Sequence, residues 1–305
     1  MVKLVLFDID GTLVRTGGAG MAAFARAGEL AFGIRDGTRG MNFAGRTDTS
    51  LVREFFGRHG LAPTPAHFQQ FFERYVFLLD HYLREHPGRV CPGVPAWLAT
   101  LARLDPPPLI GLQTGNLRLG AEIKLRHFGL WDAFVTGAFG DDHEDRNQLA
   151  VMAHQRGSRL LGTPLRGGEI LVVGDTPFDI ACGRAIGARV LAVATGGASL
   201  DEIQRHRPDW AVDNLDSISV EAVLDGATAR SAVQWRWPPP AQQPQAVRSI
   251  LHASPTPQGA SSAPELAANT ESFLRSLVEP QCGQAVPCQR DDRTSISLSF
   301  PQPGQ

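Results

Sequence analysis

Residues 4–12 read LVLFDIDGT, an apolar run that ends abruptly in two acids, a glycine and a threonine. The apolar half predicts a strand buried on both faces. In an extended chain the carboxylates of Asp8 and Asp10 point to the same side, and Ile9 points to the other. Two neighbouring anions repel unless a cation lies between them, and Mg²⁺ with oxygen ligands is the simplest candidate. The alternative is a strand that merely ends in a turn-forming Asp-Gly pair.

Composition narrows the class of protein. The chain has 305 residues, of which 43% are hydrophobic and 20% charged, and this suits a globular protein with one large core or two smaller ones. A net charge of -2 and a pI near 6.5 argue against nucleic acid and anionic membranes as partners. No apolar run approaches the roughly 20 residues of a membrane span, and acids follow the N-terminus too closely for a secretory signal. We therefore expect a cytoplasmic protein that acts on a small molecule.

The four cysteines fit that compartment. Cys91 and Cys182 lie in apolar segments, where reduced thiols are expected. Cys282 and Cys288 lie near the C-terminus without the spacing of a metal site, and a disulfide between them is the alternative.

After the first strand the hydrophobic pattern becomes helical. Helices are expected at residues 20–32, 47–58 and 65–85, which together form an inserted all-helical module at residues 16–89. The third is clearest, because large apolar side chains recur along one side of it: Phe68, Phe71, Phe72, Tyr75, Val76, Leu79, Tyr82 and Leu83. We expect these side chains to pack between helices rather than to form a ligand cage.

From residue 90 onward, strands alternate with helices. Strands are expected at residues 109–113, 133–138, 169–173, 189–194 and 210–212, and helices at residues 94–104, 117–128, 144–157, 177–186 and 200–205. This alternation predicts an α/β, Rossmann-like domain made of residues 1–15 and 90–225. Its mostly parallel sheet carries helices on both faces, and its active site lies at the carboxyl ends of the strands.

Residues 226–305 differ in composition, being rich in Pro, Gln, Ser and Ala. Such a segment buries too little apolar surface to offset its ordering entropy, so we expect a disordered C-terminal tail with a transient helix at residues 270–278. Trp235 and Trp237, followed by prolines, suggest an extended segment that docks on an unidentified partner.

The second strand–helix junction carries groups that suit a phosphate. The strand at residues 109–113 runs into Thr114, Gly115 and Asn116, where a helix begins. The Thr114 hydroxyl and the backbone N–H groups of Gly115 and Asn116 are suitable phosphate donors. An ordinary helix N-cap, supplied by Thr114 or Asn116, is the alternative.

A third junction adds acids. The strand at residues 169–173 is followed by Asp175, and Pro177 suits the first helical position with Thr176 as the cap. Asp179 lies one helical turn after Asp175, where an acid is also favourable simply because it is in the first turn of a helix. The structural reason for an acid is weaker at Asp175, because this residue lies just ahead of the helix cap.

Together these three junctions resemble the first, second and fourth signature motifs of the haloacid dehalogenase-like superfamily. The resemblance is closest to its phosphoglycolate-phosphatase-like hydrolases, and it covers residues 1 to about 225. It implies that residues 16–89 form a helical cap domain over the active site. It also implies a magnesium-dependent phosphatase that hydrolyses a small phosphorylated metabolite through an aspartyl-phosphate intermediate.

The resemblance assigns a role to each matching residue. Asp8 corresponds to the nucleophile, and Asp10 to the general acid that protonates the leaving alcohol and later activates water. Mg²⁺ would be held by the Asp8 carboxylate, the backbone carbonyl of Asp10 and the Asp175 carboxylate. Asp179 would support these ligands from behind or act through a water molecule. Thr114 would bind a phosphate oxygen.

The third motif departs from the family pattern, which has a lysine there. Arg146 takes that place here; it keeps the positive charge but has a bulkier, planar head. Lys124 is the second candidate, although a solvated helix face is the expected environment for it. The neighbouring acids are equally consistent with a charged helix start: Asp141, Asp142, Glu144 and Asp145.

Two features of the expected cap bear on the substrate. Arg46 begins a helix at residues 47–58 and is placed to bind a carboxylate or phosphate, or else it simply faces solvent. Residues 17–20, which read GGAG, are expected to be the hinge on which the cap moves.

Three other functions are consistent with parts of the pattern. A haloacid dehalogenase shares the aspartate nucleophile but has no use for an acid at Asp10. A phosphomutase differs mainly in its cap residues and in the access of water to the phospho-enzyme. A non-catalytic scaffold would keep the fold and recruit partners through its tail, and the departure at Arg146 is its only support.

Overall fold

The computed structural model of the chain describes residues 1–224. The predictions for the tail therefore fall outside the described residues, including the Trp235 and Trp237 segment and the pair Cys282 and Cys288.

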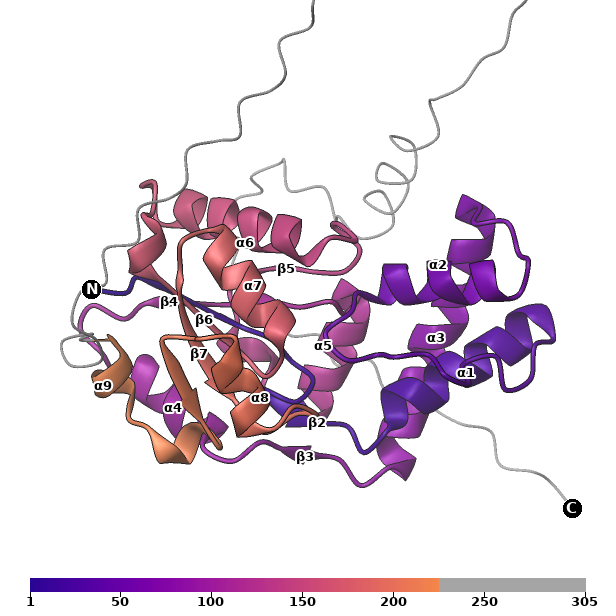
Figure 1. Ribbon diagram of the computed structural model, residues 1–305, viewed down its shortest axis with the longest axis horizontal. Helices are drawn as coiled ribbons and strands as arrows, with labels where there is room; N and C mark the ends of the chain where they lie inside the picture. The colour runs from indigo at the N-terminus through magenta and orange to yellow at the C-terminus, as the bar shows by residue number, and fades with distance from the viewer. Residues whose placement is uncertain (225–305) are drawn as a thin grey trace, which may run out of the picture. The chain divides into compact units, whose positions relative to one another are not determined.

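A six-stranded sheet forms the centre of the described residues, with the strand order β5-β4-β1-β6-β7-β8 (Figure 1). All of its ladders are parallel. The strands are β1 (Leu4–Phe7), β4 (Leu109–Gln113), β5 (Thr136–Ala138), β6 (Ile170–Gly174), β7 (Arg189–Val193) and β8 (Trp210–Val212). Leu4 of β1 pairs with Leu109 on one side and Ile170 on the other, so the ends of β1, β4 and β6 lie side by side. The predicted α/β, Rossmann-like sheet is confirmed.

Both faces of the sheet are buried, which explains the nearly continuous apolar runs of its strands. Val5 and Phe7 share one hydrophobic cluster with the helix that contains Trp97, whereas Leu4 and Leu6 pack with Leu149. The first face carries α4 (Val94–Leu101), α5 (Arg118–His127) and α9 (Val220–Leu224). The second face carries α6 (Arg146–Leu160), α7 (Pro177–Ala185) and α8 (Leu200–Arg205). Short 3-10 turns connect the elements: η1 (Trp131–Ala133), η2 (Gly167–Glu169) and η3 (Leu215–Ser217).

Several expected elements are shorter in the structure, for local reasons. The helix expected from residue 144 begins at Arg146, because the Asp145 side chain accepts a hydrogen bond from the backbone N–H of Asn147 and so lies outside the helix as its N-cap. The strand expected from residue 133 begins at Thr136, and Ala133 is instead the last residue of η1. The helix expected to reach residue 104 ends at Leu101.

The helical insertion (residues 16–89) consists of α1 (Ala19–Phe32), α2 (Asp48–Arg58) and α3 (Pro65–Glu85). Its centre is aromatic: Phe24 contacts Phe71 with ring centroids 4.6 Å apart, and Phe55 and Phe56 are fully buried. The prediction that the α3 stripe packs between helices is confirmed. Leu117 of the segment leading into α5 belongs to the same cluster, so the insertion shares its core with the rest of the chain. The proposed division into a core domain and a cap domain stays a prediction.

A two-strand antiparallel ribbon joins the insertion to the sheet. It pairs β2 (Val14–Arg15) with β3 (Arg89–Val90), the two places where the chain enters and leaves the insertion. The segment predicted to be a hinge is partly helical, and its role as a hinge stays a prediction. Gly17 and Gly18 have left-handed φ angles of 64° and 93°, which glycine adopts readily, but the next two residues already belong to α1.

Candidate active site

The acids of the first junction, Asp8 and Asp10, lie just after the carboxyl end of β1. Asp8 continues the strand, and its N–H donates to the Val173 carbonyl at 2.9 Å. The chain then turns at Gly11, which has a φ of 87°. A Cβ at position 11 would lie 2.4 Å from Oδ2 of Asp175, so glycine is required there both for its backbone conformation and for space. This turn brings the end of β1 against the end of β6.

Three carboxylates meet at these strand ends. Oxygens of Asp8, Asp175 and Asp179 all lie within 4.8 Å of one another, and all three residues are buried. The Thr12 hydroxyl donates to Asp175 at 3.0 Å. Asp179 accepts the backbone N–H of Thr176 at 3.0 Å and its hydroxyl at 2.7 Å. We call Asp8, Asp175 and Asp179 the acid cluster.

One guanidinium faces the acid cluster. Nη2 of Arg146 lies 3.6 Å from Oδ1 of Asp8, and it also forms an ion pair with Asp179. Arg146 is only 8% exposed, and its Nε has no hydrogen-bond partner among the described residues. Burial alone would lower the pKa of Arg146, but Asp179 and Asp8 outweigh burial and keep this pKa above its ordinary value.

The charges of the acid cluster do not balance. Burial raises the pKa of Asp8 to about 7, although the Arg146 charge opposes the rise. Burial, followed by the charges of Asp179 and Asp8, raises the pKa of Asp175 well above its ordinary value. When all three acids are ionised, one guanidinium leaves about two negative charges uncompensated in a buried space. Carboxylate oxygens are the ligands that hard divalent cations prefer, so the acid cluster fits a divalent metal ion.

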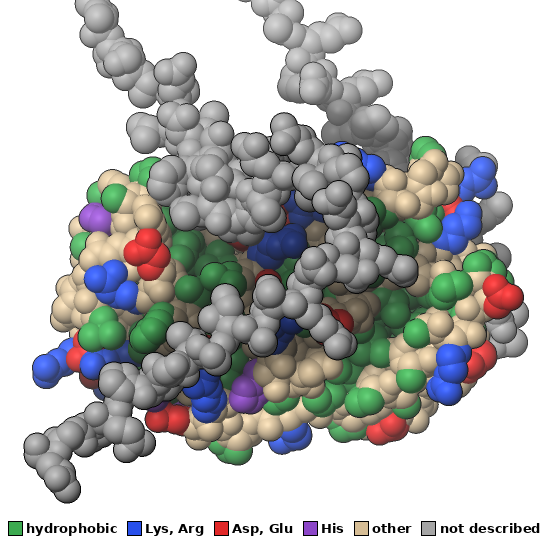
Figure 2. Space-filling view, turned by 180° about the vertical axis from the view of Figure 1, so that it is seen from behind, with side chains coloured by type: hydrophobic (Ala, Val, Ile, Leu, Met, Phe, Trp, Pro, Cys, Tyr) green, Lys and Arg blue, Asp and Glu red, His purple; other side chains and the backbone are tan. Residues whose placement is uncertain are grey.

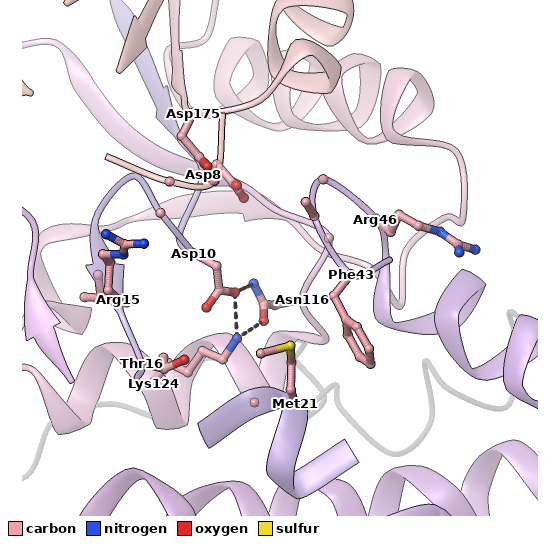
Figure 3. Close-up of a pocket in the computed structure, with 18 of the residues that line it drawn as sticks. Asp8, Asp10, Arg15, Thr16, Met21, Phe43, Arg46, Asn116, Lys124 and Asp175 are labelled. Carbon is pink, nitrogen blue, oxygen red and sulfur yellow. Dashed lines mark hydrogen bonds and ion pairs between the residues drawn. The ribbon is translucent and has the colours of Figure 1, made fainter. Parts of the chain in front are cut away.

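Asp10 lies in a different environment, shown in Figure 3. Nζ of Lys124 donates to Oδ2 of Asp10 and to Oδ1 of Asn116, both at 2.6 Å. Nδ2 of Asn116 donates to the same Asp10 oxygen at 2.8 Å. The Asp10 side chain is 44% exposed, while that of Lys124 is 4% exposed. We call Asp10, Asn116 and Lys124 the Asp10 triad.

The expectation that Lys124 lies on a solvated helix face was wrong. Lys124 is buried in α5 and directed at Asp10. The sequence held a signal for this position: Leu117, Ala121 and Leu125 form the buried stripe, and Lys124 follows Leu117 by seven residues on the same stripe.

The phosphate-site residues of the second junction are arranged around Thr114. This residue is fully buried, and its hydroxyl oxygen accepts the backbone N–H of Asn116 at 3.3 Å and the Asn116 side chain at 2.8 Å. The alternative of an ordinary N-cap was wrong, because α5 begins only at Arg118 and neither Thr114 nor Asn116 caps it. The binding of phosphate by Thr114, Gly115 and Asn116 stays a prediction.

Sequence reasoning missed the residue that binds this junction from the insertion. Oδ2 of Asp48 accepts the backbone N–H of Leu117 at 2.9 Å, and the Asp48 N–H donates to the Gly115 carbonyl at 2.7 Å. Burial raises the pKa of Asp48 to about 6, with Lys124 opposing the rise. A Cβ at Gly115 would lie 2.2 Å from the Arg46 carbonyl oxygen, so the two segments are in close contact.

Arg46 is the predicted site residue whose charged end lies apart from the others. Its guanidinium forms an ion pair with Glu54 and donates to the Ser50 carbonyl at 3.2 Å. In Figure 3 this guanidinium points away from Asp8 and Asp10. A contact between Arg46 and a substrate stays a prediction.

The acids before α6 have structural partners. Asp142 pairs with Arg156, Glu144 with Arg53, and Asp141 accepts the backbone N–H of Arg118. The interpretation as a charged helix start holds for Asp145, which caps α6, whereas the other three acids lie ahead of the helix.

A cavity of about 610 Å³ opens in front of both acid groups. Asp8, Asp10 and Asp175 line one side, and the insertion contributes apolar side chains that include Met21 and Phe43 (Figure 3). Such a volume suits a small ligand. On the face shown in Figure 2, basic and acidic side chains are mixed over the visible surface of the described residues, as the nearly neutral composition predicts. None of the helices within residues 1–224 is both long and apolar enough to span a membrane.

Comparisons with known proteins identify a family, a related sequence and similar folds. The family model of haloacid dehalogenase-like hydrolases matches residues 2–187. A phosphoglycolate phosphatase of Chromobacterium violaceum is 32% identical over 205 residues, which cover 65% of this chain and 87% of that protein. Two solved structures share the fold. A predicted phosphoglycolate phosphatase of Haemophilus somnus has a TM-score of 0.56 at 20% identity, covering 73% of this chain and 97% of that one. A β-phosphoglucomutase of Clostridium difficile has a TM-score of 0.57 at 15% identity, covering 74% and 97%.

Proposed function

The chain belongs to the haloacid dehalogenase-like hydrolase family, and on that premise we propose that it is a magnesium-dependent phosphatase of a small phosphomonoester. The resemblance inferred from the three motifs is confirmed by the family match and by the phosphoglycolate phosphatase relative. The observation that carries the proposal is the pairing of a buried, charge-unbalanced acid cluster with the half-exposed Asp10 at one cavity.

The metal would be held by the acid cluster. Asp8, Asp175 and Asp179 supply carboxylate oxygens, and the backbone carbonyl of Asp10 is the further ligand that the family resemblance implies. When bound, Mg²⁺ offsets the negative charge of the cluster and of the phosphoryl oxygens, so that an anionic carboxylate can approach phosphorus.

The remaining chemistry belongs to side chains of this chain. An Asp8 oxygen forms a bond to phosphorus while the bond from phosphorus to the leaving alcohol oxygen breaks, giving an aspartyl-phosphate. Asp10 donates its proton to that alcohol oxygen. In the second step Asp10 takes a proton from a water molecule, and the water oxygen forms a bond to phosphorus. The bond between phosphorus and the Asp8 oxygen breaks, which releases phosphate and restores the Asp8 carboxylate. Arg146 stabilises negative charge beside Asp8, and Lys124 with Asn116 orients Asp10.

The alternatives fit the site less well. A dehalogenase attacks carbon and needs no proton donor, yet two side chains hold Asp10 at the cavity. A non-catalytic scaffold has no need for three buried carboxylates, which destabilise one another. A phosphomutase uses the same residues for its first step, so product analysis has to separate it from a phosphatase.

The proposal is tested by hydrolysis of an aryl phosphate with and without Mg²⁺. We expect metal-dependent release of phosphate by the wild-type protein and loss of turnover in Asp8→Asn. Asp132→Asn serves as the matched control, because that side chain is 93% exposed on the short turn η1. Halide release from haloacids would favour the dehalogenase, and phosphoryl transfer to a second substrate position would favour the mutase. No turnover on any phosphate would favour the scaffold.

A further inference from the structure

Two arginines stand directly opposite each other on the ribbon that joins the insertion to the sheet. Arg15 of β2 pairs with Arg89 of β3 in antiparallel register, and both line the cavity. Residues directly opposite in an antiparallel pair project from the same face. Figure 3 draws Arg15 on the cavity wall, on the opposite side of Asp10 from Asn116. The ribbon therefore presents two guanidiniums to the active site.

Neither arginine has a carboxylate partner within residues 1–224. The ion pairs of this part of the chain use other basic residues, and none within 4.0 Å includes Arg15 or Arg89. Like charges directly opposite each other destabilise a strand pair. Both side chains are exposed, so the pair adds no burial that would offset this repulsion.

The other positive charges around the cavity are already matched. Lys124 is bound to Asp10, Arg146 to Asp8 and Asp179, and the Arg46 guanidinium to Glu54. The insertion side is largely apolar, with Met21 and Phe43 on the wall. Among the described residues that line the cavity, the unmatched positive charge is thus gathered on the ribbon.

We propose that Arg15 and Arg89 form a subsite for a second anionic group of the substrate. The inference rests on the proposed phosphatase function: the scissile phosphoryl group lies at Asp8, the leaving oxygen at Asp10, and the rest of the substrate extends toward the ribbon. The substrate class is then a short phosphomonoester that carries a further carboxylate or phosphate. Guanidinium groups bind either anion through paired, charge-assisted hydrogen bonds.

A matched series of two-carbon substrates tests this subsite. Ethyl phosphate has no second charge, phosphoglycolate has a carboxylate, and ethylene glycol bisphosphate has a second phosphate. We expect the wild-type enzyme to prefer one or both of the charged compounds, and the preferred compound identifies the anion. In Arg15→Gln/Arg89→Gln, kcat/KM for the preferred compound should fall roughly 10- to 100-fold, mainly through KM, because hydrogen bonds between charged groups are lost. For ethyl phosphate it should change less than about twofold on the same scale of effects.

Arg159→Gln is the control, since Arg159 is exposed in the last turn of α6, away from the cavity lining. It should leave all three substrates unchanged. The inference is overturned if the double variant loses as much activity on ethyl phosphate as on the charged compounds, or if it loses none. A melting curve of the double variant that matches wild type excludes damage to the ribbon as the cause of a selective loss.

Binding separates this inference from the proposed function. Calorimetry with Asp8→Asn protein, Mg²⁺ and phosphoglycolate or ethylene glycol bisphosphate requires no turnover. If wild type hydrolyses none of the phosphates but the ribbon substitutions weaken this binding, the proposed function fails and the subsite stands. If ethyl phosphate is hydrolysed and neither binding nor kcat/KM depends on the ribbon arginines, the subsite fails and the phosphatase stands.

Discussion

The acid cluster and the Asp10 triad begin two residues apart on one strand end, yet they differ in charge balance and exposure. The acid cluster sets three carboxylates against one guanidinium, and all four residues are at least nine-tenths buried. The Asp10 triad sets one carboxylate against one ammonium and one amide, and Asp10 is 44% exposed. A buried group with excess negative charge needs a cation, whereas a balanced, half-exposed acid can exchange a proton with a ligand. We therefore expect the acid cluster to bind the metal and supply the nucleophile, and the Asp10 triad to transfer protons.

The largest expected effect comes from removing the cation of each group in turn. Arg146→Ala should lower kcat/KM for an aryl phosphate by roughly 10²- to 10³-fold, as the loss of one preorganised charge donor does in other sites. Lys124→Ala should lower it only about tenfold, because Asp10 keeps the hydrogen bond from Asn116. Steady-state kinetics at saturating Mg²⁺ measure both values.

Arg146→Lys is the matched variant, because it keeps the charge without the planar fork and should recover part of the activity. Loss of a buried ion-pair partner also destabilises a protein by about 3–5 kcal/mol, so the melting temperatures of all three variants are needed. Equal losses in Arg146→Ala and Lys124→Ala would mean that Arg146 does not replace the lysine of the third motif.

A metal titration examines the charge imbalance without turnover. At a Mg²⁺ concentration about 1,000 times its Kd, the wild-type protein should gain about 4 kcal/mol of stability, seen as a rise in Tm. Asp175→Asn should lose most of this gain, because one ligand of the acid cluster is gone. Asp10→Asn should keep much of it, because only the backbone carbonyl of Asp10 is an expected ligand. Similar losses in both variants would contradict the separation of the two groups.

The smallest expected effect is a pH dependence of stability at Asp48, which joins the insertion to the Asp10 triad. Its folded-state pKa of about 6 lies above the ordinary value of 3.8, so the folded protein holds the proton over this interval and unfolding releases it. The stability contributed by the protonated form is therefore present at pH 4 and is lost as the pH rises to about 6. Relative to Asp48→Asn, the wild-type protein should lose roughly 2–3 kcal/mol across this window.

Urea unfolding of both proteins between pH 4 and 7 measures this difference. Asparagine retains a side-chain oxygen that can accept the Leu117 N–H, so the variant removes the titration and keeps the contact. Parallel stability curves for the two proteins would show that Asp48 does not titrate in this range.

Most of the sheet was predictable because its signals are local. Each buried strand is a short apolar run followed by polar residues, as in residues 4–12, and the polar residues necessarily lie at the carboxyl edge of a parallel sheet. Thr176 and Pro177 likewise place the start of α7 correctly from capping rules alone.

The parts that escaped prediction depend on contacts between distant segments. Lys124 is buried because α5 lies against both the sheet and the insertion, and a single positive residue on an apolar stripe does not reveal what faces it. Asp48 binds Leu117 across 69 positions of sequence. The strands β2 and β3 have two residues each, too few for a period-2 pattern, so the facing pair Arg15 and Arg89 becomes visible only in the folded chain.

The two-strand ribbon has one more consequence. The facing guanidiniums of Arg15 and Arg89 repel each other across the incoming and outgoing passes of the chain. An anion bound between them would attract both. A bound ligand would then hold these two passes together at the point where residues 16–89 join the sheet. Departure of the dephosphorylated product would remove this link, so substrate occupancy would set how firmly the two strands of the ribbon are held together.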